Sequence, residues 1–266
     1  MNARRTLARP LLAVLALLVA VCALAAPTQA RAEDRSGGIY LRCRADVAPG
    51  HGVVPEVGKT FSYTLYVTVD DVPYSGEFGG NHYVDGCTTL TQTPGYQLTV
   101  PLPLGSRYTI EQTAEIGYDT SVDGVSGLKK SGGVHAKGGY ETVTFQNTLN
   151  PAPAQFSPVG LTKTLTGGTL AAGAYEYKMV VTDDGAQVAE RSAANAADGS
   201  IAFEAVDLAS VGTYHVTVTE LGDASTAGHS DNVLEMDVVV SQRGSSLVCE
   251  SAVTSGSLTF AGTISP

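Results

Sequence analysis

Residues 61–69 read FSYTLYVTV, in which apolar and polar side chains alternate until the chain turns at Asp70-Asp71. Successive side chains of a β-strand point to opposite faces of a sheet, so this alternation predicts a strand with one buried face. Turn residues separate further segments with the same pattern: 96–100, 108–112, 141–145, 174–182, 212–220, 233–240 and 257–260. Only residues 186–197 are compatible with a turn or two of helix. The sequence therefore predicts an all-β protein.

The composition agrees with this class and excludes several functions. The chain has 266 residues, of which 43% are hydrophobic and 16% are charged. This apolar fraction is too high for a disordered chain. The formal net charge of −10 argues against nucleic acid or an anionic membrane as a partner.

The N-terminal segment has the features of a signal peptide. Three arginines precede an unbroken apolar run of 16 residues, 11–26, and Ala30-Arg31-Ala32 offers small residues for cleavage. The run is shorter than the roughly 20 residues that span a bilayer. We expect residues 1–32 to be removed on export, leaving no transmembrane segment in a secreted or cell-surface protein. Loss of four arginines and no acid would change the net charge from −10 to −14.

A proline-rich stretch divides the remaining chain. Residues 150–154 read NPAPA, and proline cannot donate to a strand ladder. Many short strands on either side favour β-sandwiches, so we predict one over 33–150, a linker over 151–154 and a second sandwich over 155–266. The two parts also repeat each other weakly. Each opens with a short strand, 39–43 or 159–165, and each ends on a Thr-Phe pair.

These motifs resemble the pilin and adhesin modules of Gram-positive bacteria. The second part resembles the pilin isopeptide-linkage domain through residues 161–165 (LTKTL), 172–177 (AGAYEY), 195–203 and 212–220. The first part resembles the sister pilin domain through residues 59–65 (KTFSYTL), 104–111 and 144–148 (TFQNT). The resemblance implies two tandem immunoglobulin-like sandwiches of the collagen-adhesin B type. It also implies a structural or adhesive surface protein, similar to a pilin subunit or an adhesin stalk, whose partners are other pilus or surface subunits or a host ligand.

In that family a lysine on the first strand attacks an asparagine on the last strand with the help of a glutamate, and an amide crosslink forms across the sandwich. Lys163 and Glu220 match the lysine and the glutamate in the second part, but Gly262 stands where the asparagine is expected. We therefore expect no amide there, and Lys163 to be a strand lysine paired with Glu220.

The first part lacks the lysine instead. Glu111 and Asn147 match the glutamate and the asparagine, but Cys43 stands where the lysine is expected, so the matching pair becomes a hydrogen-bonded remnant. Because exported proteins meet oxidising conditions, we expect a disulfide between Cys43 and Cys87, with a free buried thiol or a reactive thiol as the alternatives. Cys249 is the odd thiol, either buried and inert or paired between molecules.

No motif in the chain points to an enzyme, a metal site or a cofactor. The five histidines lack a second ligand at metal spacing, and motifs of hydrolases, phosphate loops and dinucleotide sites are missing. The alternative function is a soluble extracellular binding protein that holds a carbohydrate or a host protein in a sandwich loop. Residues 72–86 form the longest irregular stretch, and its candidate binding side chains are Tyr74, Phe78, His82 and Tyr83.

Overall fold

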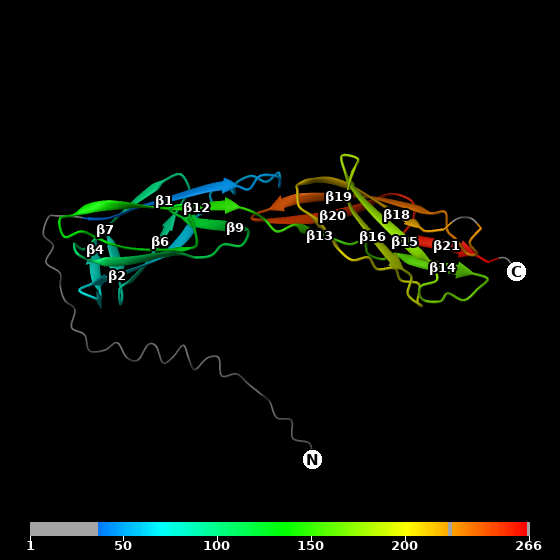
Figure 1. Cartoon of the computed structure of the whole chain (residues 1–266), viewed down its shortest axis with the longest axis horizontal. Helices are drawn as coiled ribbons and strands as arrows, with labels where there is room; N and C mark the ends of the chain where they lie inside the picture. Colours follow the sequence, from blue (N-terminus) through cyan, green and yellow to red (C-terminus); the bar gives the residue numbers. More distant parts are fainter. Residues whose placement is uncertain (1–36, 223–224, 265–266) are drawn as a thin grey trace, which may run out of the picture.

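The computed structural model describes residues 37–222 and 225–264, and all regular secondary structure in these residues is β (Figure 1). The all-β class predicted from the sequence is confirmed. The signal peptide predicted over 1–32 lies outside the described residues. In the part of the chain that the structure covers, there is no helix of the length and hydrophobicity needed to cross a membrane.

Two sheets enclose the core of residues 37–149, which we term the N-terminal half. One sheet has the strand order β10-β9-β12-β1-β7, and the other has β11-β8-β2-β3 with β6 also paired to β2. A small hairpin, β4-β5, follows β3. The bounds are β1 Gly37–Val47, β2 Phe61–Val69, β3 Val72–Pro73, β4 Gly76–Phe78, β5 Asn81–Tyr83, β6 Cys87–Gln92, β7 Gln97–Leu102, β8 Arg107–Gln112, β9 Tyr118–Val122, β10 Val125–Ser126, β11 Lys129–Gly133 and β12 Gly139–Leu149.

Strand β2 shows why the alternating sequence folds this way. Phe61, Tyr63, Leu65 and Val67 are fully buried, whereas the side chains between them remain at least partly exposed. Because the side-chain period of a strand is two, every second residue of β2 enters the space between the two sheets. The strand observed has the bounds that the sequence predicts.

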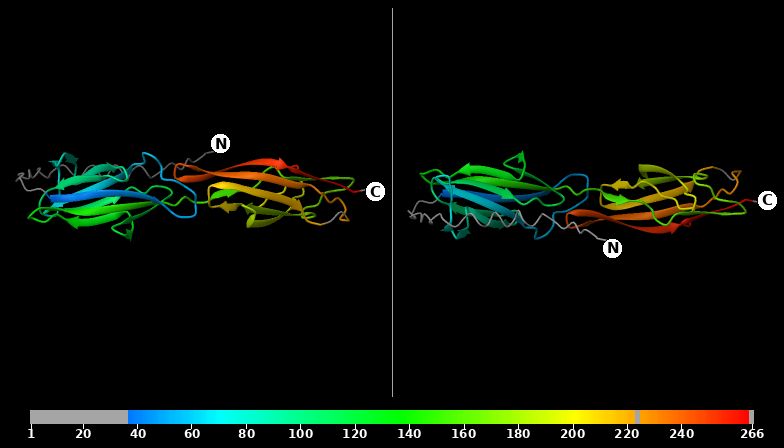
Figure 2. Two further views of the ribbon diagram at one scale, coloured as in Figure 1. Left: turned by 90° about the horizontal axis from the view of Figure 1, so that it is seen from above. Right: turned by 90° about the horizontal axis from the view of Figure 1, so that it is seen from below.

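Residues 154–264, the C-terminal half, enclose a second buried cluster. A five-stranded sheet with the order β16-β15-β18-β19-β20 forms one side, and the pairs β14-β21 and β13-β17 complete the layer opposite. The two halves lie end to end in the views of Figure 2. The bounds are β13 Ala154–Phe156, β14 Thr162–Thr166, β15 Glu176–Asp183, β16 Ala186–Ala194, β17 Val206–Leu208, β18 Gly212–Glu220, β19 Val233–Arg243, β20 Ser246–Ser255 and β21 Thr259–Thr263.

The short helix considered for residues 186–197 is not formed, and β16 occupies most of that segment. The reason is the turn before it. Asp184 and Gly185 have positive φ angles of 46° and 80°, which direct the chain back along β15 as a tight hairpin. Hairpin pairing therefore overrides the helix propensity of the alanines in this segment.

The boundary between the two predicted sandwiches stays a prediction. Strands of the N-terminal half end at Leu149, and those of the C-terminal half begin at Ala154, the last residue of the predicted linker. However, Val53 and Leu149 pack in the buried cluster of the C-terminal half. The two halves therefore share apolar contacts across the linker.

Candidate functional site

Each half pairs an early strand with a late strand in parallel. In the N-terminal half β1 runs beside β12, and in the C-terminal half β14 runs beside β21. Cys43 lies opposite Phe145 in the first ladder, and Lys163 lies opposite Phe260 in the second. The registers therefore make Cys43 and Lys163 equivalent positions, as the sequence repeat predicts.

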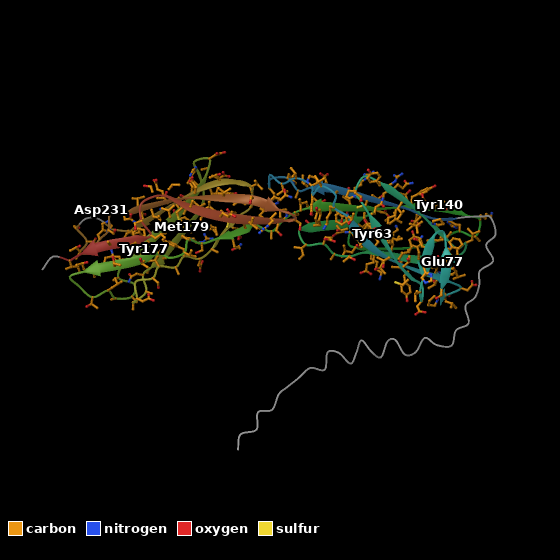
Figure 3. The ribbon with its side chains drawn as sticks, turned by 180° about the vertical axis from the view of Figure 1, so that it is seen from behind. Tyr63, Glu77, Tyr140, Tyr177, Met179 and Asp231 are labelled. Carbon is orange, nitrogen blue, oxygen red and sulfur yellow. The ribbon has the colours of Figure 1, made fainter. Side chains whose placement is uncertain are left out.

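A tyrosine completes the equivalence from the facing sheet. Tyr63 and Tyr177, labelled in Figure 3, each meet one of these phenylalanine rings edge to face, with ring centroids 4.9 Å and 5.1 Å apart. Tyr63 lies opposite Gln112 across β2 and β8, and Tyr177 lies opposite Glu220 across β15 and β18. Each half thus holds one buried polar site built on the same frame.

In the C-terminal half the Lys163 ammonium group uses all of its donors. Its Nζ donates to Glu220 Oε1 at 2.9 Å, to Glu220 Oε2 at 2.7 Å and to the carbonyl oxygen of Gly228 at 2.7 Å. An ammonium group has three donors, so these contacts satisfy it. Nζ also lies 4.0 Å from the centroid of the Tyr175 ring. Both charged side chains are 0% exposed, and the predicted pairing of Lys163 with Glu220 is present as a buried ion pair.

Further donors surround the Glu220 carboxylate. The Tyr177 hydroxyl and the amide of Ser230 each donate to it at 3.3 Å, and His229 Nδ1 lies 3.4 Å from Oε1. Burial, and after it the charge of Glu220, raises the pKa of the Tyr177 phenol well above its usual value. The phenol therefore stays protonated and remains a donor. Tyr177 lies in the motif 172–177 without a role assigned to it, and Ser230 and His229 lie outside the quoted motifs.

A backbone carbonyl occupies the place of the missing acceptor. A Cβ atom built on Gly262 would lie 1.7 Å from the carbonyl oxygen of Gly228, the same oxygen that accepts from Lys163. No side chain fits at position 262 unless this segment moves. Asn195, a buried asparagine of this half, uses its carboxamide on backbone groups of Tyr175, Ala171 and Ala196.

The N-terminal site is neutral. The Asn147 carboxamide donates to Cys43 Sγ at 3.6 Å and to Gln112 Oε1 at 3.1 Å. Asn147 Oδ1 accepts from Gln112 Nε2 at 2.6 Å and from the Thr120 hydroxyl at 2.8 Å. Asn147 is therefore buried and hydrogen-bonded, as the sequence predicts.

The assignment of Glu111 to this site is wrong. Glu111 is exposed and lies 3.7 Å from Lys129 on the outer surface, whereas its neighbour Gln112 is 1% exposed and contacts Asn147. Adjacent residues of a strand face opposite sides, so an alignment error of one residue moves a side chain from the core to solvent. The motif match therefore assigned the role of the assisting glutamate to residue 111, one position before the residue that faces the core.

The predicted disulfide is not formed, and both Cys43 and Cys87 are free thiols. Cys43 points into the core of the N-terminal half. Cys87 lies opposite Tyr66, whose side chain is on the outer face of the other sheet, so the two Cβ atoms do not point toward one another. Bridging requires facing Cβ atoms about 4 Å apart. Sequence proximity within one half could not reveal on which side of its sheet each thiol lies.

The loop expected to bind a ligand is instead a packed hairpin. Tyr74 and Tyr83 are 9% and 1% exposed, and both belong to the N-terminal core. Tyr74 meets the rings of both Phe78 and Tyr83 edge to face. Burial raises the pKa of Tyr83 to about 12. Of the four candidate residues, only His82 is well exposed, with Nδ1 2.7 Å from Glu77 Oε1. The exposed aromatic cluster expected of a binding loop is therefore not formed by these residues.

Two other features were considered from the sequence. The Cys249 thiol is half-buried and donates to the carbonyl of Gln155 at 3.3 Å. Within residues 37–222 and 225–264, no group of three or more histidine, cysteine or acidic side chains is placed to hold a metal ion.

No family model and no curated protein match the sequence. Among solved structures, the chain is similar to the pilus-presented adhesin Spy0125 (Cpa), with a TM-score of 0.35 and 22% identity over 42% of this chain. It spans 27% of that adhesin's length. The shaft pilin SpaA of Lactobacillus rhamnosus GG gives a TM-score of 0.29 and 16% identity, with 87% of this chain and 99% of the pilin covered.

The major pilin T-13 of Streptococcus pyogenes serotype GAS131465 gives a TM-score of 0.26 and 12% identity, with 88% of this chain and 98% of the pilin covered. All three are pilus proteins. The chain is therefore similar to streptococcal and lactobacillal pilin or adhesin structures, the group that its motifs resemble. Identities of 12–22% and TM-scores of 0.26–0.35 are too low to transfer a function from them.

We predict that Cys43 resists alkylation in the folded protein. Burial raises the pKa of its thiol, so the protonated, unreactive form persists at about pH 8, near the usual pKa of cysteine. Iodoacetamide should label Cys87 in the native state and Cys43 only after unfolding, as read by peptide mass spectrometry. Recovery of a Cys43–Cys87 linked peptide from the unreduced protein would contradict this assignment.

Breaking the buried ion pair should destabilise the C-terminal half strongly. Lys163→Met leaves the Glu220 carboxylate buried without its partner, which costs about 3–5 kcal/mol. The double variant Lys163→Met/Glu220→Leu should recover most of that loss, because no charge is left buried. As a control, Lys178→Met breaks an exposed pair with Glu190 and should change stability by less than about 1 kcal/mol. Urea unfolding, monitored by resistance to trypsin, measures the stability of all three variants. Equal losses of stability in the single and double variants would refute the role of the buried charge.

Filling position 262 should also destabilise this half. The added methyl group of Gly262→Ala overlaps the Gly228 carbonyl, and such overpacking costs about 1–3 kcal/mol. Gly212→Ala is the matched control, because a Cβ on Gly212 meets nothing within 4 Å. If the two variants have the same urea midpoint, the Gly228 carbonyl does not close the site as described.

Proposed function

We propose that the protein is a secreted structural or adhesive module of the bacterial cell surface, of the pilin-subunit or adhesin-stalk type. In this proposal sandwiches over 33–150 and 155–266 are joined in tandem by the linker over 151–154 and carry tension. Other pilus or surface subunits, or a host ligand, are the partners. The observation that carries the proposal is the parallel pairing of β1 with β12 and of β14 with β21.

Parallel pairing determines how a pulling force acts on each half. The chain enters the first ladder at Gly37 and leaves it at Leu149, at the opposite end of the same pair of strands. Tension between the chain ends therefore slides β1 against β12, and all hydrogen bonds of the ladder resist together. The second ladder has the same geometry between Thr162 and Thr263. This arrangement suits a protein that transmits force along its length.

Non-covalent contacts tie the strands where the related domains have an amide. In the C-terminal half the buried Lys163–Glu220 pair links β14 to β18, and the Gly228 carbonyl fills the acceptor position. In the N-terminal half Asn147 joins β12 to β1 through Cys43 and to β8 through Gln112. An amide needs an amine and a carboxamide in the same site, and neither half brings both together. We therefore infer that both crosslinks are missing.

End-to-end pulling should require more force than pulling the same ladder open. In single-molecule force spectroscopy, handles on the two chain ends shear β1 against β12. Handles on the N-terminal end and on a cysteine introduced at Gly138, beside the start of β12, peel the same ladder apart bond by bond. The first geometry should give the higher unfolding force for the N-terminal half. Equal forces in the two geometries would refute a load-bearing design.

The intact mass of the exported protein should equal that of its unmodified residues. Formation of an amide from lysine and asparagine releases one ammonia, so each crosslink would lower the mass by one ammonia. High-resolution mass spectrometry under reducing conditions makes this measurement. A deficit of one ammonia would contradict the inference for one half, and a deficit of two would contradict it for both.

A further inference from the structure

Residues 50–52, in the connection between β1 and β2 of the N-terminal half, lie against the C-terminal half. His51 Nδ1 lies 2.7 Å from the carbonyl oxygen of Ala209, to which it donates when it carries a proton. The amide of Val211 donates to the carbonyl of His51 at 2.9 Å. The Ser210 hydroxyl donates to the carbonyl of Gly50 at 2.7 Å. Three hydrogen bonds therefore join this connection to the segment between β17 and β18.

Gln242 of β19 binds the continuation of the same connection. Its Oε1 accepts from the amide of Val54 at 2.9 Å, and its Nε2 donates to the carbonyl of Val54 at 2.8 Å. One side chain thus satisfies both backbone groups of Val54, as a neighbouring strand would. Val53 is 7% exposed and belongs to the C-terminal cluster, whereas Val54 and Val57 are 66% and 100% exposed. The connection therefore inserts one apolar side chain into the other half.

A second contact lies beside the linker. A Cβ atom on Gly117 would lie 2.2 Å from the carbonyl oxygen of Ser245, so the connection between β8 and β9 touches the turn between β19 and β20. The amide of Asn150 donates to the carbonyl of Gly117 at 2.8 Å. Leu149 is fully buried in the C-terminal cluster, and Pro151 is buried as well. Contacts between the halves therefore lie beside the start of the linker, whereas Ala152 and Pro153 within it are exposed.

Halves of a chain that are joined by a short linker move relative to one another unless an apolar, hydrogen-bonded interface holds them. We propose that residues 50–54 are a clamp whose binding surface on the C-terminal half is formed by residues 209–211 and Gln242. The clamp fixes the angle between the halves and makes the chain one stiff unit. In the proposed surface function, the clamped chain would serve as a stiff spacer. Only this use of the clamp rests on the proposed function.

Residual dipolar couplings of the full exported chain test the clamp. Backbone amides of both halves should fit a single alignment tensor in the parent protein. Two variants weaken the clamp: Val53→Ser/Gln242→Ala removes the apolar insertion and the backbone pairing, and Ser210→Ala/Gln242→Ala removes only hydrogen bonds. In both, the halves should lose the common tensor, and each should fit a separate one of different magnitude.

The control is Val57→Ser/Gln187→Ala. Val57 lies in the same connection but is fully exposed, and Gln187 bonds to Glu190 on its own strand, so this variant should keep the common tensor. If Val53→Ser unfolds the C-terminal half, the amide signals of that half lose their dispersion. The test then rests on Ser210→Ala/Gln242→Ala, which removes only hydrogen bonds. Separate tensors in the parent, or a common tensor in every folded clamp variant, would overturn the proposal.

The force experiment separates this proposal from the proposed function. The clamp lies outside both parallel ladders, so the clamp variants should keep the unfolding force of each half. Equal shear and peeling forces with a common tensor would refute load bearing and leave the clamp supported. Separate tensors in the parent, together with a shear force higher than the peeling force, would refute the clamp and leave the proposed mechanical function supported.

Discussion

The parallel ladder between an early and a late strand is the constraint on which each half depends. In the N-terminal half it sets Cys43 beside Phe145, and in the C-terminal half it sets Lys163 beside Phe260. The facing sheet then adds a tyrosine and its cross-strand neighbour. One geometric arrangement therefore fixes the position of the buried polar site and also places the ends of the chain at opposite ends of the ladder. The parallel ladder thus determines both where the buried polar site lies and how a pulling force acts on each half.

The two sites show two ways of keeping polar groups in a core. A buried charge is costly unless it is paired and hydrogen-bonded, and Lys163 meets this condition with Glu220 and the Gly228 carbonyl. The N-terminal site avoids charge, because two carboxamides satisfy one another across β8 and β12. Cys43 adds a small, weakly polar group that burial keeps protonated. Lys163 and Asn147 are therefore each hydrogen-bonded by different chemistry on the same frame, although the Tyr63 hydroxyl of the N-terminal site has no hydrogen-bond partner among the described residues.

Much of this could be predicted, and two of the errors share one cause. The period of two located β2 and β18 to the residue, and the motifs predicted the pairing of Lys163 with Glu220 and a hydrogen-bonded Asn147 in the core of the other half. The predicted role of Glu111 and the predicted disulfide were both wrong because each assumed the wrong face of the sheet for a side chain. A one-residue change in register reverses that side, and a short motif does not fix register to one residue.

The sequence by itself determined the long alternating strands such as β2 and β18, the β class and the residue types available to each site, because alternation and turn chemistry are local properties of the chain. Only the tertiary structure decided which of these residues meet. It turned the predicted binding loop into a packed hairpin and brought a backbone carbonyl to the place of a missing side chain. It also laid residues 50–54 across the junction, on partners more than 150 positions away. Such contacts depend on how sheets stack and where connections pass, and these are set by the packing of the whole chain rather than by any local pattern.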